Sequence, residues 1–187
     1  MQILKSAILY TLIIIFSYNI DAQETLTRLK VTKEISVAIP ESFTQMTDAE
    51  LYNKYISDRK PIAMYTSRDK RADFGINVNS SPWAGNDLEI LKSFYKANMG
   101  NLFTEVEFLT DEVQTIGNRQ FAVLEFVSVL VDENSIGTVN TVSKYTYIQY
   151  TIRNGKVLLF NFTCPALQKK KWESTAKEIM QSVRIKS

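Results

Sequence analysis

The strongest hydrophobic pattern in the chain runs from Lys144 to Val183. Residues 145–152 and 157–164 are rich in aromatic and β-branched side chains, a composition typical of half-buried strands. Asn154-Gly155 stands between them, and this pair is the preferred loop of a type I′ hairpin because both positions need positive φ. The pattern therefore predicts a β-hairpin. Pro165 ends it, because proline has no N–H for the sheet.

The position of the loop also predicts the register of the hairpin. Three facing pairs follow from it on one side of the sheet: Tyr145 with Cys164, Tyr147 with Phe162, and Gln149 with Phe160. After Gln168 the apolar period becomes helical, with a stripe formed by Trp172, Ala176, Ile179, Met180 and Val183. We expect this helix to pack on the aromatic side of the hairpin. The other side is apolar as well, so we expect it to be covered too.

The rest of the chain alternates between strand and helix patterns. It predicts a strand over 35–39 ended by Pro40, a short helix after Thr47, strands over 62–66 and 74–78, and a longer helix over 88–102. It then predicts a polar strand or a pair of short strands over 106–114, and a strand over 121–131 that is apolar on both faces. Thr47 with Glu50, and Asn86 with Glu89, are the capping signals of the two helices. Strands in hairpins with helices between them predict an α+β fold with a mainly antiparallel sheet.

The N-terminal residues 1–22 have the three-part pattern of a secretory signal peptide. Lys5 precedes an apolar stretch over 7–16, and the more polar residues after it end at Ala22. We predict an exported protein, periplasmic or extracellular, with a flexible lead-in over 23–34, one domain over 35–187 and no stable membrane span after cleavage. The alternative is an anchor formed by the uncleaved segment, whose apolar part is short for a span of about 20 residues.

Composition removes several kinds of chemistry. The chain has no histidine, which excludes Ser-His-Asp and Cys-His catalysis and histidine metal sites. Its one cysteine, Cys164, faces Tyr145 in the predicted hairpin, so we interpret it as a core residue rather than a nucleophile. The net charge of +2 is too small to indicate a nucleic-acid partner. We expect no enzyme activity, no cofactor and no metal.

Glu125 is the most unusual polar residue, because it lies inside the most apolar predicted strand, on the side of Val123 and Val127. A buried carboxylate needs partners. One interpretation is an acid in an apolar pocket beneath the longer helix, together with Leu91 and Tyr95. The other, which we favour, is an ion pair with a lysine or arginine on a neighbouring strand, or exposure at the rim of the sheet.

The order of motifs resembles the PsbP-like superfamily, which includes the extrinsic photosystem II protein, DcrB-like bacterial envelope proteins and a Ran-binding nuclear-import factor. The resemblance covers about residues 35–187 and rests on the strand ending in Pro40, on Phe74-Gly75-Ile76-Asn77, Gly117-Asn118-Arg119, Asn154-Gly155-Lys156 and Phe162-Thr163-Cys164-Pro165, and on Trp172. It implies an α/β/α sandwich with a mainly antiparallel central sheet flanked by helices. It implies a binding or assembly role and no shared catalytic residues, and the metal-binding histidine of some photosynthetic members is missing here.

We therefore expect a non-catalytic exported binding or assembly protein of the cell envelope, whose partner is another envelope protein. The alternative is a carrier of small ligands or lipids with an apolar pocket near Glu125. Three loops are candidate partner sites: the basic loop 67–72 with Arg68, Lys70 and Arg71, the loop 80–85 that carries Trp83, and the acidic loop 132–137. Trp83 would anchor the partner, unless it folds back as a lid on the longer helix. Lys169-Lys170-Lys171 is interpreted as a solvated helix face rather than an anion site.

Overall fold

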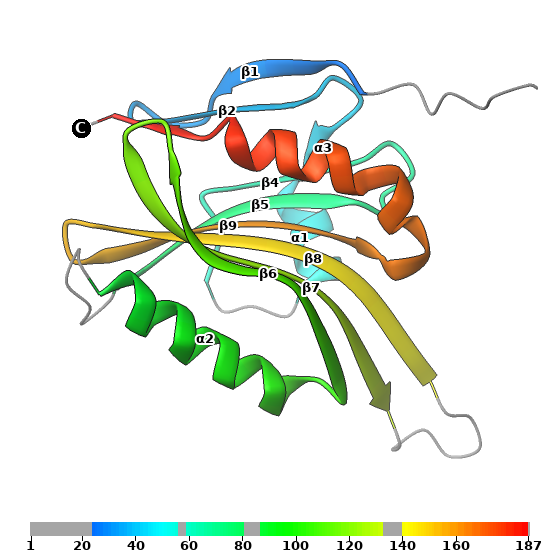
Figure 1. The fold of residues 1–187 in the computed structure, drawn as a ribbon. Helices are drawn as coiled ribbons and strands as arrows, with labels where there is room; N and C mark the ends of the chain where they lie inside the picture. The colour runs from blue at the N-terminus through cyan, green and yellow to red at the C-terminus, as the bar shows by residue number, and fades with distance from the viewer. Residues whose placement is uncertain (1–23, 56–58, 81–86, 133–139, 187) are drawn as a thin grey trace, which may run out of the picture.

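The computed structural model describes residues 24–55, 59–80, 87–132 and 140–186, and Figure 1 shows their arrangement. The strands are β1 (Leu26–Lys30), β2 (Ile35–Pro40), β3 (Thr44–Gln45), β4 (Ala63–Thr66), β5 (Asp73–Ser80), β6 (Glu105–Ile116), β7 (Arg119–Asp132), β8 (Asn140–Arg153), β9 (Lys156–Pro165) and β10 (Arg184–Ile185). The helices are α1 (Asp48–Lys54), α2 (Leu88–Leu102), the 3-10 helix η1 (Ala166–Gln168) and α3 (Lys169–Gln181). Within these ranges, no helix combines the length and the apolar character that a membrane span requires. The predicted signal peptide lies outside the described residues.

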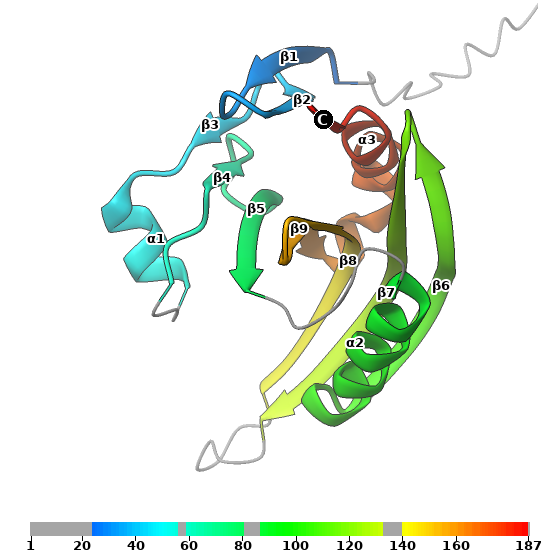
Figure 2. The same cartoon turned by 90° about the vertical axis from the view of Figure 1, so that its left-hand side faces the viewer.

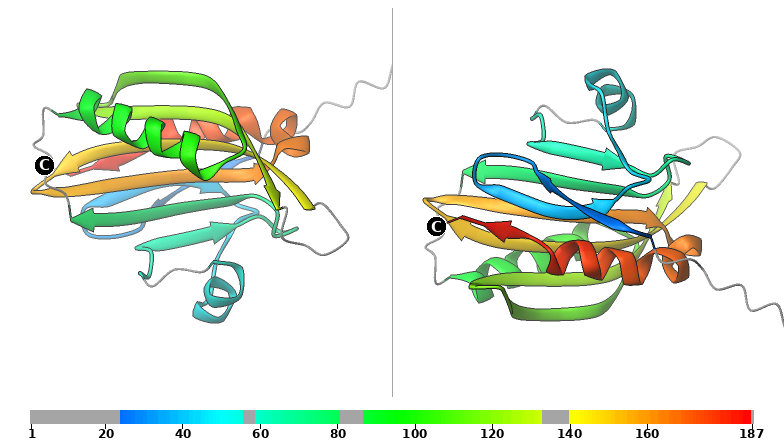
Figure 3. Two further views of the ribbon diagram at one scale, coloured as in Figure 1. Left: turned by 90° about the horizontal axis from the view of Figure 1, so that it is seen from below. Right: turned by 90° about the horizontal axis from the view of Figure 1, so that it is seen from above.

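The described strands form two antiparallel sheets. The larger sheet has the order β3-β4-β5-β9-β8-β7-β6, and the smaller sheet has the order β1-β2-β10. Figure 2 shows that the larger sheet is strongly curved, so that β6 and β7 rise beside α3. The smaller sheet and α3 lie on one face of the larger sheet, and α2 lies on the opposite face (Figure 3). The predicted α+β sandwich with a mainly antiparallel central sheet is therefore confirmed.

The hairpin of β8 and β9 has the predicted turn and the predicted register. Asn154 and Gly155 adopt φ values of 50° and 67°, as a type I′ loop requires. Tyr145 pairs with Cys164, and the pairs of Tyr147 and Gln149 are also the predicted ones. Pro165 is the last residue of β9. The turn therefore sets which side chains of these two strands face α3.

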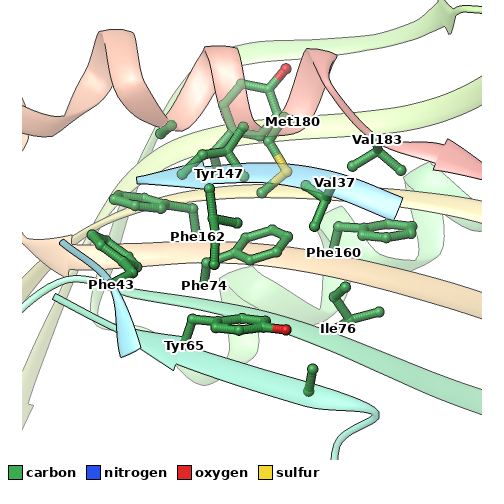
Figure 4. Close-up of a cluster of buried hydrophobic side chains, with 14 of the residues drawn as sticks. Val37, Phe43, Tyr65, Phe74, Ile76, Tyr147, Phe160, Phe162, Met180 and Val183 are labelled. Atoms are coloured by element: carbon green, nitrogen blue, oxygen red, sulfur yellow. The ribbon is translucent and has the colours of Figure 1, made fainter. Parts of the chain in front are cut away.

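The main core lies between the larger sheet on one side and β2 with α3 on the other. Figure 4 shows aromatic side chains of β5 and β9 meeting Met180 and Val183 from the C-terminal part of the chain. All five residues of the predicted helical stripe are buried: Trp172, Ala176, Ile179, Met180 and Val183. The predicted docking of this helix on the aromatic side of the hairpin is thus confirmed.

The prediction of a flexible lead-in is wrong for residues 26–30, because these residues form β1. This strand pairs with β2 along its whole length, from Leu26 opposite Pro40 to Lys30 opposite Ser36. Leu26 and Leu29 pack against the main core. The mainly polar composition concealed the strand, because its backbone partners come from β2 rather than from its own local pattern. The folded domain therefore begins before Ile35.

Helix α1 has the predicted capping box but is held to the sheet by polar contacts. The Thr47 hydroxyl accepts from the Glu50 N–H, and the Glu50 carboxylate accepts from the Thr47 N–H. None of the α1 side chains is buried. Instead, Lys54 and the Tyr55 hydroxyl bind the buried carboxylate of Asp73 on β5, with the Lys54 Nζ 2.7 Å from Oδ2.

Candidate functional site

The carboxylate of Glu125 on β7 is 1% exposed and is held by three side chains. The Tyr145 hydroxyl donates to Oε1 at 2.8 Å, and the Thr110 hydroxyl donates to Oε2 at 2.8 Å. The Lys177 Nζ of α3 lies 3.3 Å from Oε1. Glu125 therefore has a cationic partner, as we favoured, but the predicted position of that partner is wrong, because the lysine comes from a helix and not from a neighbouring strand.

A β-bulge explains why Thr110 reaches Glu125. Phe108 pairs with Phe126 and Thr110 pairs with Glu125, so Leu109 is an extra residue without a partner in β7. The extra residue moves Thr110 to the face of the sheet on which Glu125 lies. Sequence reasoning missed Thr110, because nothing in the local pattern of β6 marks the bulge.

The charges around Glu125 continue along α3. Lys177 and Lys169 both pair with Glu173, at 2.8 Å and 2.7 Å, and hold the pKa of that carboxyl below its usual range. Burial, followed by the hydrogen bond to Glu125, raises the pKa of the Tyr145 phenol, so the phenol stays a donor at neutral pH. Both oxygens of Glu125 are already acceptors. A ligand would have to displace one of these protein partners before it reached the acid.

The predicted pocket of Glu125, Tyr95 and Leu91 is wrong, because these residues lie on opposite faces of β7. Glu125 points to the α3 side together with Val123, as predicted. Leu91 and Tyr95 belong to α2, which covers the other face, and the Tyr95 ring stacks on Tyr150 with centroids 4.3 Å apart. Successive strand residues point to opposite faces, and only the tertiary structure decides which helix covers which face.

The space beneath α2 opens toward β6 instead. A hollow of about 650 Å³ lies there, lined by residues of α2 and β6 and by Phe103 and Thr104 between them. Lys92 and Lys96 of α2 both pair with Asp111, and hold the pKa of this carboxyl below its usual range. Glu125 is not among the lining residues. Because Lys92 and Lys96 pair with Asp111, the charges of these two lysines are already balanced within the protein.

Cys164 is a core residue, as predicted. It is buried beside Tyr145, and burial raises the pKa of its thiol to about 12. An ordinary cysteine has a pKa near ~8.5, and the thiolate is the reactive form.

We expect Cys164 to resist alkylation in the folded protein. At pH 8 a thiol of pKa about 12 is ionised in only about one molecule in ten thousand, compared with roughly a quarter for an ordinary cysteine. Iodoacetamide labelling followed by intact-mass measurement should be at least about a hundredfold slower in buffer than in urea. Equal rates in the two conditions would mean that Cys164 is accessible and that the hairpin face is open.

The basic loop between β4 and β5 is ordered, but its three basic residues do not act as one group. The Ser67 hydroxyl accepts hydrogen bonds from the N–H groups of Arg71 and Ala72, at 3.3 Å and 3.0 Å. Lys70 turns toward α1 and pairs with Glu50 at 2.9 Å, which lowers the pKa of Glu50 to about 2. Arg68 and Arg71 remain exposed. Trp83 and residues 133–137 of the acidic loop, the other predicted partner sites, lie outside the described residues.

Arg68 lies beside the start of α3. We call this place the Arg68 hollow, a surface depression of about 410 Å³ lined by Glu24, Ser42, Ser67, Arg68, Asp69, Lys171 and Trp172. The Ser67 hydroxyl holds the pKa of Asp69 below its usual range, and the nearby Lys171 ammonium adds to this shift. The structure thus brings together a loop arginine and a helix lysine that are far apart in the sequence. Sequence reasoning treated Lys171 only as part of a solvated run of lysines.

Comparisons with known proteins reveal the fold through structure rather than sequence. No family model matches the chain, and no curated protein matches it. Among solved structures, the chain is similar to cyanobacterial PsbP from Synechocystis sp. PCC 6803, with a TM-score of 0.54 and 13% identity over 87% of this chain and 94% of that one. It is also similar to LpqN of Mycobacterium tuberculosis, a protein involved in cell envelope biogenesis, with a TM-score of 0.55 and 10% identity over 89% and 94% of the two chains.

A third similar structure is the Ran-binding protein Mog1p of Saccharomyces cerevisiae, with a TM-score of 0.55 and 10% identity over 87% of this chain and 96% of that one. All three likenesses extend over nearly the whole of the compared chains. At such low identity they show the fold alone. The chain has the PsbP-like fold that its motifs predicted.

Proposed function

We propose that this chain, which has the PsbP-like fold, is a non-catalytic binding or assembly protein of the cell envelope. The observation that carries the proposal is the Arg68 hollow, where Arg68 of an ordered loop and Lys171 of α3 meet on one surface. The carboxylates of Glu125 and Asp73 and the thiol of Cys164 are buried in the sheet and bound or covered by the protein's own side chains. The groups that remain accessible at the Arg68 hollow, the guanidinium of Arg68 and the ammonium of Lys171, are suited to binding a partner.

The similar structures support a binding role and a place in the envelope. Mog1p is a Ran-binding protein, and LpqN is involved in cell envelope biogenesis. Function on a shared fold depends on the surface groups that each protein carries. For this chain we assign the binding of a partner to the surface groups of the Arg68 hollow.

The partner we propose is another envelope protein that presents carboxylate groups to the hollow. Arginine binds carboxylates with two parallel hydrogen bonds, and it is enriched among the residues that dominate interface energies. The β4–β5 loop is held by its own hydrogen bonds, so little conformational entropy is lost when Arg68 binds. Loops on a rigid scaffold are the usual place for such contacts.

The test compares partner capture by charge-reversed variants. Arg68→Glu and Lys171→Glu, each bound to a support, are incubated with an envelope extract beside the wild type, and the captured proteins are quantified by mass spectrometry. We expect a specific partner to fall about tenfold or more in both variants, the effect of losing roughly 1.4 kcal/mol of binding free energy. Because both side chains are at the surface, the melting temperature should stay near that of the wild type.

The matched control is Lys30→Glu, which changes the charge by the same amount on an exposed residue of β1. This variant should capture the partner as well as the wild type does. If all three variants lose the partner equally, the interaction depends on net charge alone. If Arg68→Glu and Lys171→Glu retain it, the Arg68 hollow is not the binding site.

We also propose that the protein is exported and that its mature form begins at Gln23. The support is the signal-peptide pattern of residues 1–22, in which Lys5 precedes the apolar stretch. Intact-mass measurement of the protein purified from its native source should give the mass of residues 23–187 from the fraction outside the cytoplasm. A mass that includes Met1 to Ala22 in a membrane fraction would favour the anchored alternative.

A further inference from the structure

A third hollow lies where the two sheets meet, at the end of the main core. We call it the Lys156 hollow. It has a volume of about 520 Å³ and is formed by the turn between β1 and β2, the turn between β8 and β9, and the strand residues beneath them. Both turns lie on the left side of the molecule in Figure 1. Its volume is in the range of about 300–1,000 Å³ that small-molecule sites occupy.

The floor of the Lys156 hollow is apolar. It consists of Ile35, Ile62, Val78 and Leu158. Ile35 and Leu158 are buried members of the main core, and Ile62 packs against that core. Val78 is 39% exposed, because it lies toward the end of β5, beyond the residues of this strand that pair with β4. The core is thus open to solvent at this end, and apolar surface remains uncovered.

The rim of the Lys156 hollow is positively charged. Arg153 binds both carboxylate oxygens of Glu34, the acid of this hollow, and so links the larger sheet to the smaller one. Lys33 and Lys156 also line the hollow and are exposed. Neither lysine has an ion-pair partner in the part of the chain that the structure describes. Two uncompensated ammonium groups therefore stand next to an exposed apolar floor.

We propose that the Lys156 hollow binds a single-chain anionic amphiphile of the fatty-acid class. The hydrocarbon chain would cover Val78 and Ile62, and the carboxylate would lie between the ammonium groups of Lys33 and Lys156. Binding requires both burial of the ligand's hydrocarbon chain and attraction of its carboxylate, because the floor offers no polar group to a purely ionic ligand. The free lysines give preference to a charged head over a neutral one.

The same charges argue against a second copy of this chain as the occupant. Two copies packed through this end would bring Lys33 and Lys156 of each close together, and like charges at an interface cost binding free energy. The proposal goes beyond the binding role assigned to the Arg68 hollow, since the two hollows share no lining residue. Failure of one would leave the other standing.

The test measures binding of three probes to the purified protein by titration calorimetry and by methyl NMR. The probes are decanoate below its micelle concentration, decanol with the same chain and no charge, and inorganic phosphate with charge and no chain. We expect decanoate to bind at one saturable site and to shift the methyl signals of Ile62 and Val78. Decanol should bind at least about tenfold more weakly, a difference of ~1.4 kcal/mol, and phosphate should not saturate.

Matched variants separate this site from non-specific adsorption. Val78→Glu places a carboxylate on the floor, and its control is Val142→Glu, because Val142 on β8 is similarly exposed at 46%. A double variant, Lys33→Glu with Lys156→Glu, reverses the charge of the rim. Its control is a second double variant, Lys144→Glu with Lys170→Glu, which changes two other exposed lysines. We expect each test variant to weaken decanoate binding at least about tenfold and the controls to leave it unchanged. Circular dichroism identifies any variant that fails to fold, and the lysine pair then carries the test.

Three results would overturn the proposal. The first is the absence of saturable decanoate binding to the wild type. The second is equal weakening in the test variants and in their controls. The third is binding of decanol as tight as that of decanoate, since the lysines would then make no contribution.

Discussion

Replacing Trp172 with alanine is expected to lower the free energy of unfolding by about 3–5 kcal/mol. Trp172 is 1% exposed and fills the space between α3 and the larger sheet. Its ring meets Phe43 edge-on at 5.4 Å between centroids, and Phe162 at 6.2 Å. Removal of the indole would leave a cavity. Phe43 and Phe162 belong to separate segments of the chain, so they cannot move together to fill it. Urea denaturation, followed by circular dichroism, measures the change.

The loss at Trp172 should come from packing and not from a hydrogen bond. Its indole N–H has no partner among the residues that the structure describes. Trp172→Phe keeps most of the ring volume and removes this buried donor, so it should cost clearly less than Trp172→Ala. Tyr52→Ala is the aromatic control, because Tyr52 on α1 is 86% exposed and should change stability by less than about 0.5 kcal/mol. A change below about 1 kcal/mol for Trp172→Ala would show that α3 does not dock as described.

Replacing Glu125 with alanine is expected to cost about 2–4 kcal/mol of stability. The change leaves the hydroxyl of Tyr145, a fully buried residue, without its acceptor. It also removes the acceptor of Thr110 and the buried carboxylate beside Lys177. Lys177 is half exposed and can return to solvent, so the stranded Tyr145 hydroxyl and the cavity make up most of the cost. Thermal and urea unfolding both measure the difference.

A double-mutant cycle with Tyr145→Phe isolates the part that belongs to the hydroxyl. In the Tyr145→Phe background the Tyr145 hydroxyl is absent and cannot be left without an acceptor, so Glu125→Ala should cost about 1–3 kcal/mol less than in the wild type. Glu107→Ala on β6 is the control, because this glutamate is exposed on the edge strand and should be nearly neutral. If the effects of Glu125→Ala and Tyr145→Phe simply add, the two side chains do not interact in solution.

Local signals in the sequence were sufficient wherever the structure depends on neighbouring residues. Asn154-Gly155 determines the turn and, through it, the register of β8 and β9, because two residues at positive φ leave few ways to join two strands. Thr47 and Glu50 cap α1 through contacts three residues apart. The stripe that begins at Trp172 is buried as predicted, because 3.6-residue periodicity places those side chains on one face.

For the candidate sites, the sequence identified some of the residues but not the partners that surround them. It marked Glu125 as unusual, placed it on the side of Val123 and favoured an ion pair. It did not identify Lys177 as the cation or Thr110 as the second donor. It also grouped Leu91 and Tyr95 with Glu125, although α2 covers the opposite face of β7. Which helix lies on which face depends on the packing of whole elements, and strand alternation alone does not contain that information.

Contacts between distant segments account for what only the tertiary structure decided. β1 exists because β2 supplies its backbone partners, so a mainly polar segment became a strand. The bulge at Leu109 brings Thr110 to Glu125, and the start of α3 brings Lys171 to Arg68. The apolar floor and the cations of the Lys156 hollow come from both sheets and two turns. Turns, caps and helix stripes are determined by interactions within a few residues. The sites on this protein are formed by residues from separate elements, and a single sequence carries no local signal for such contacts.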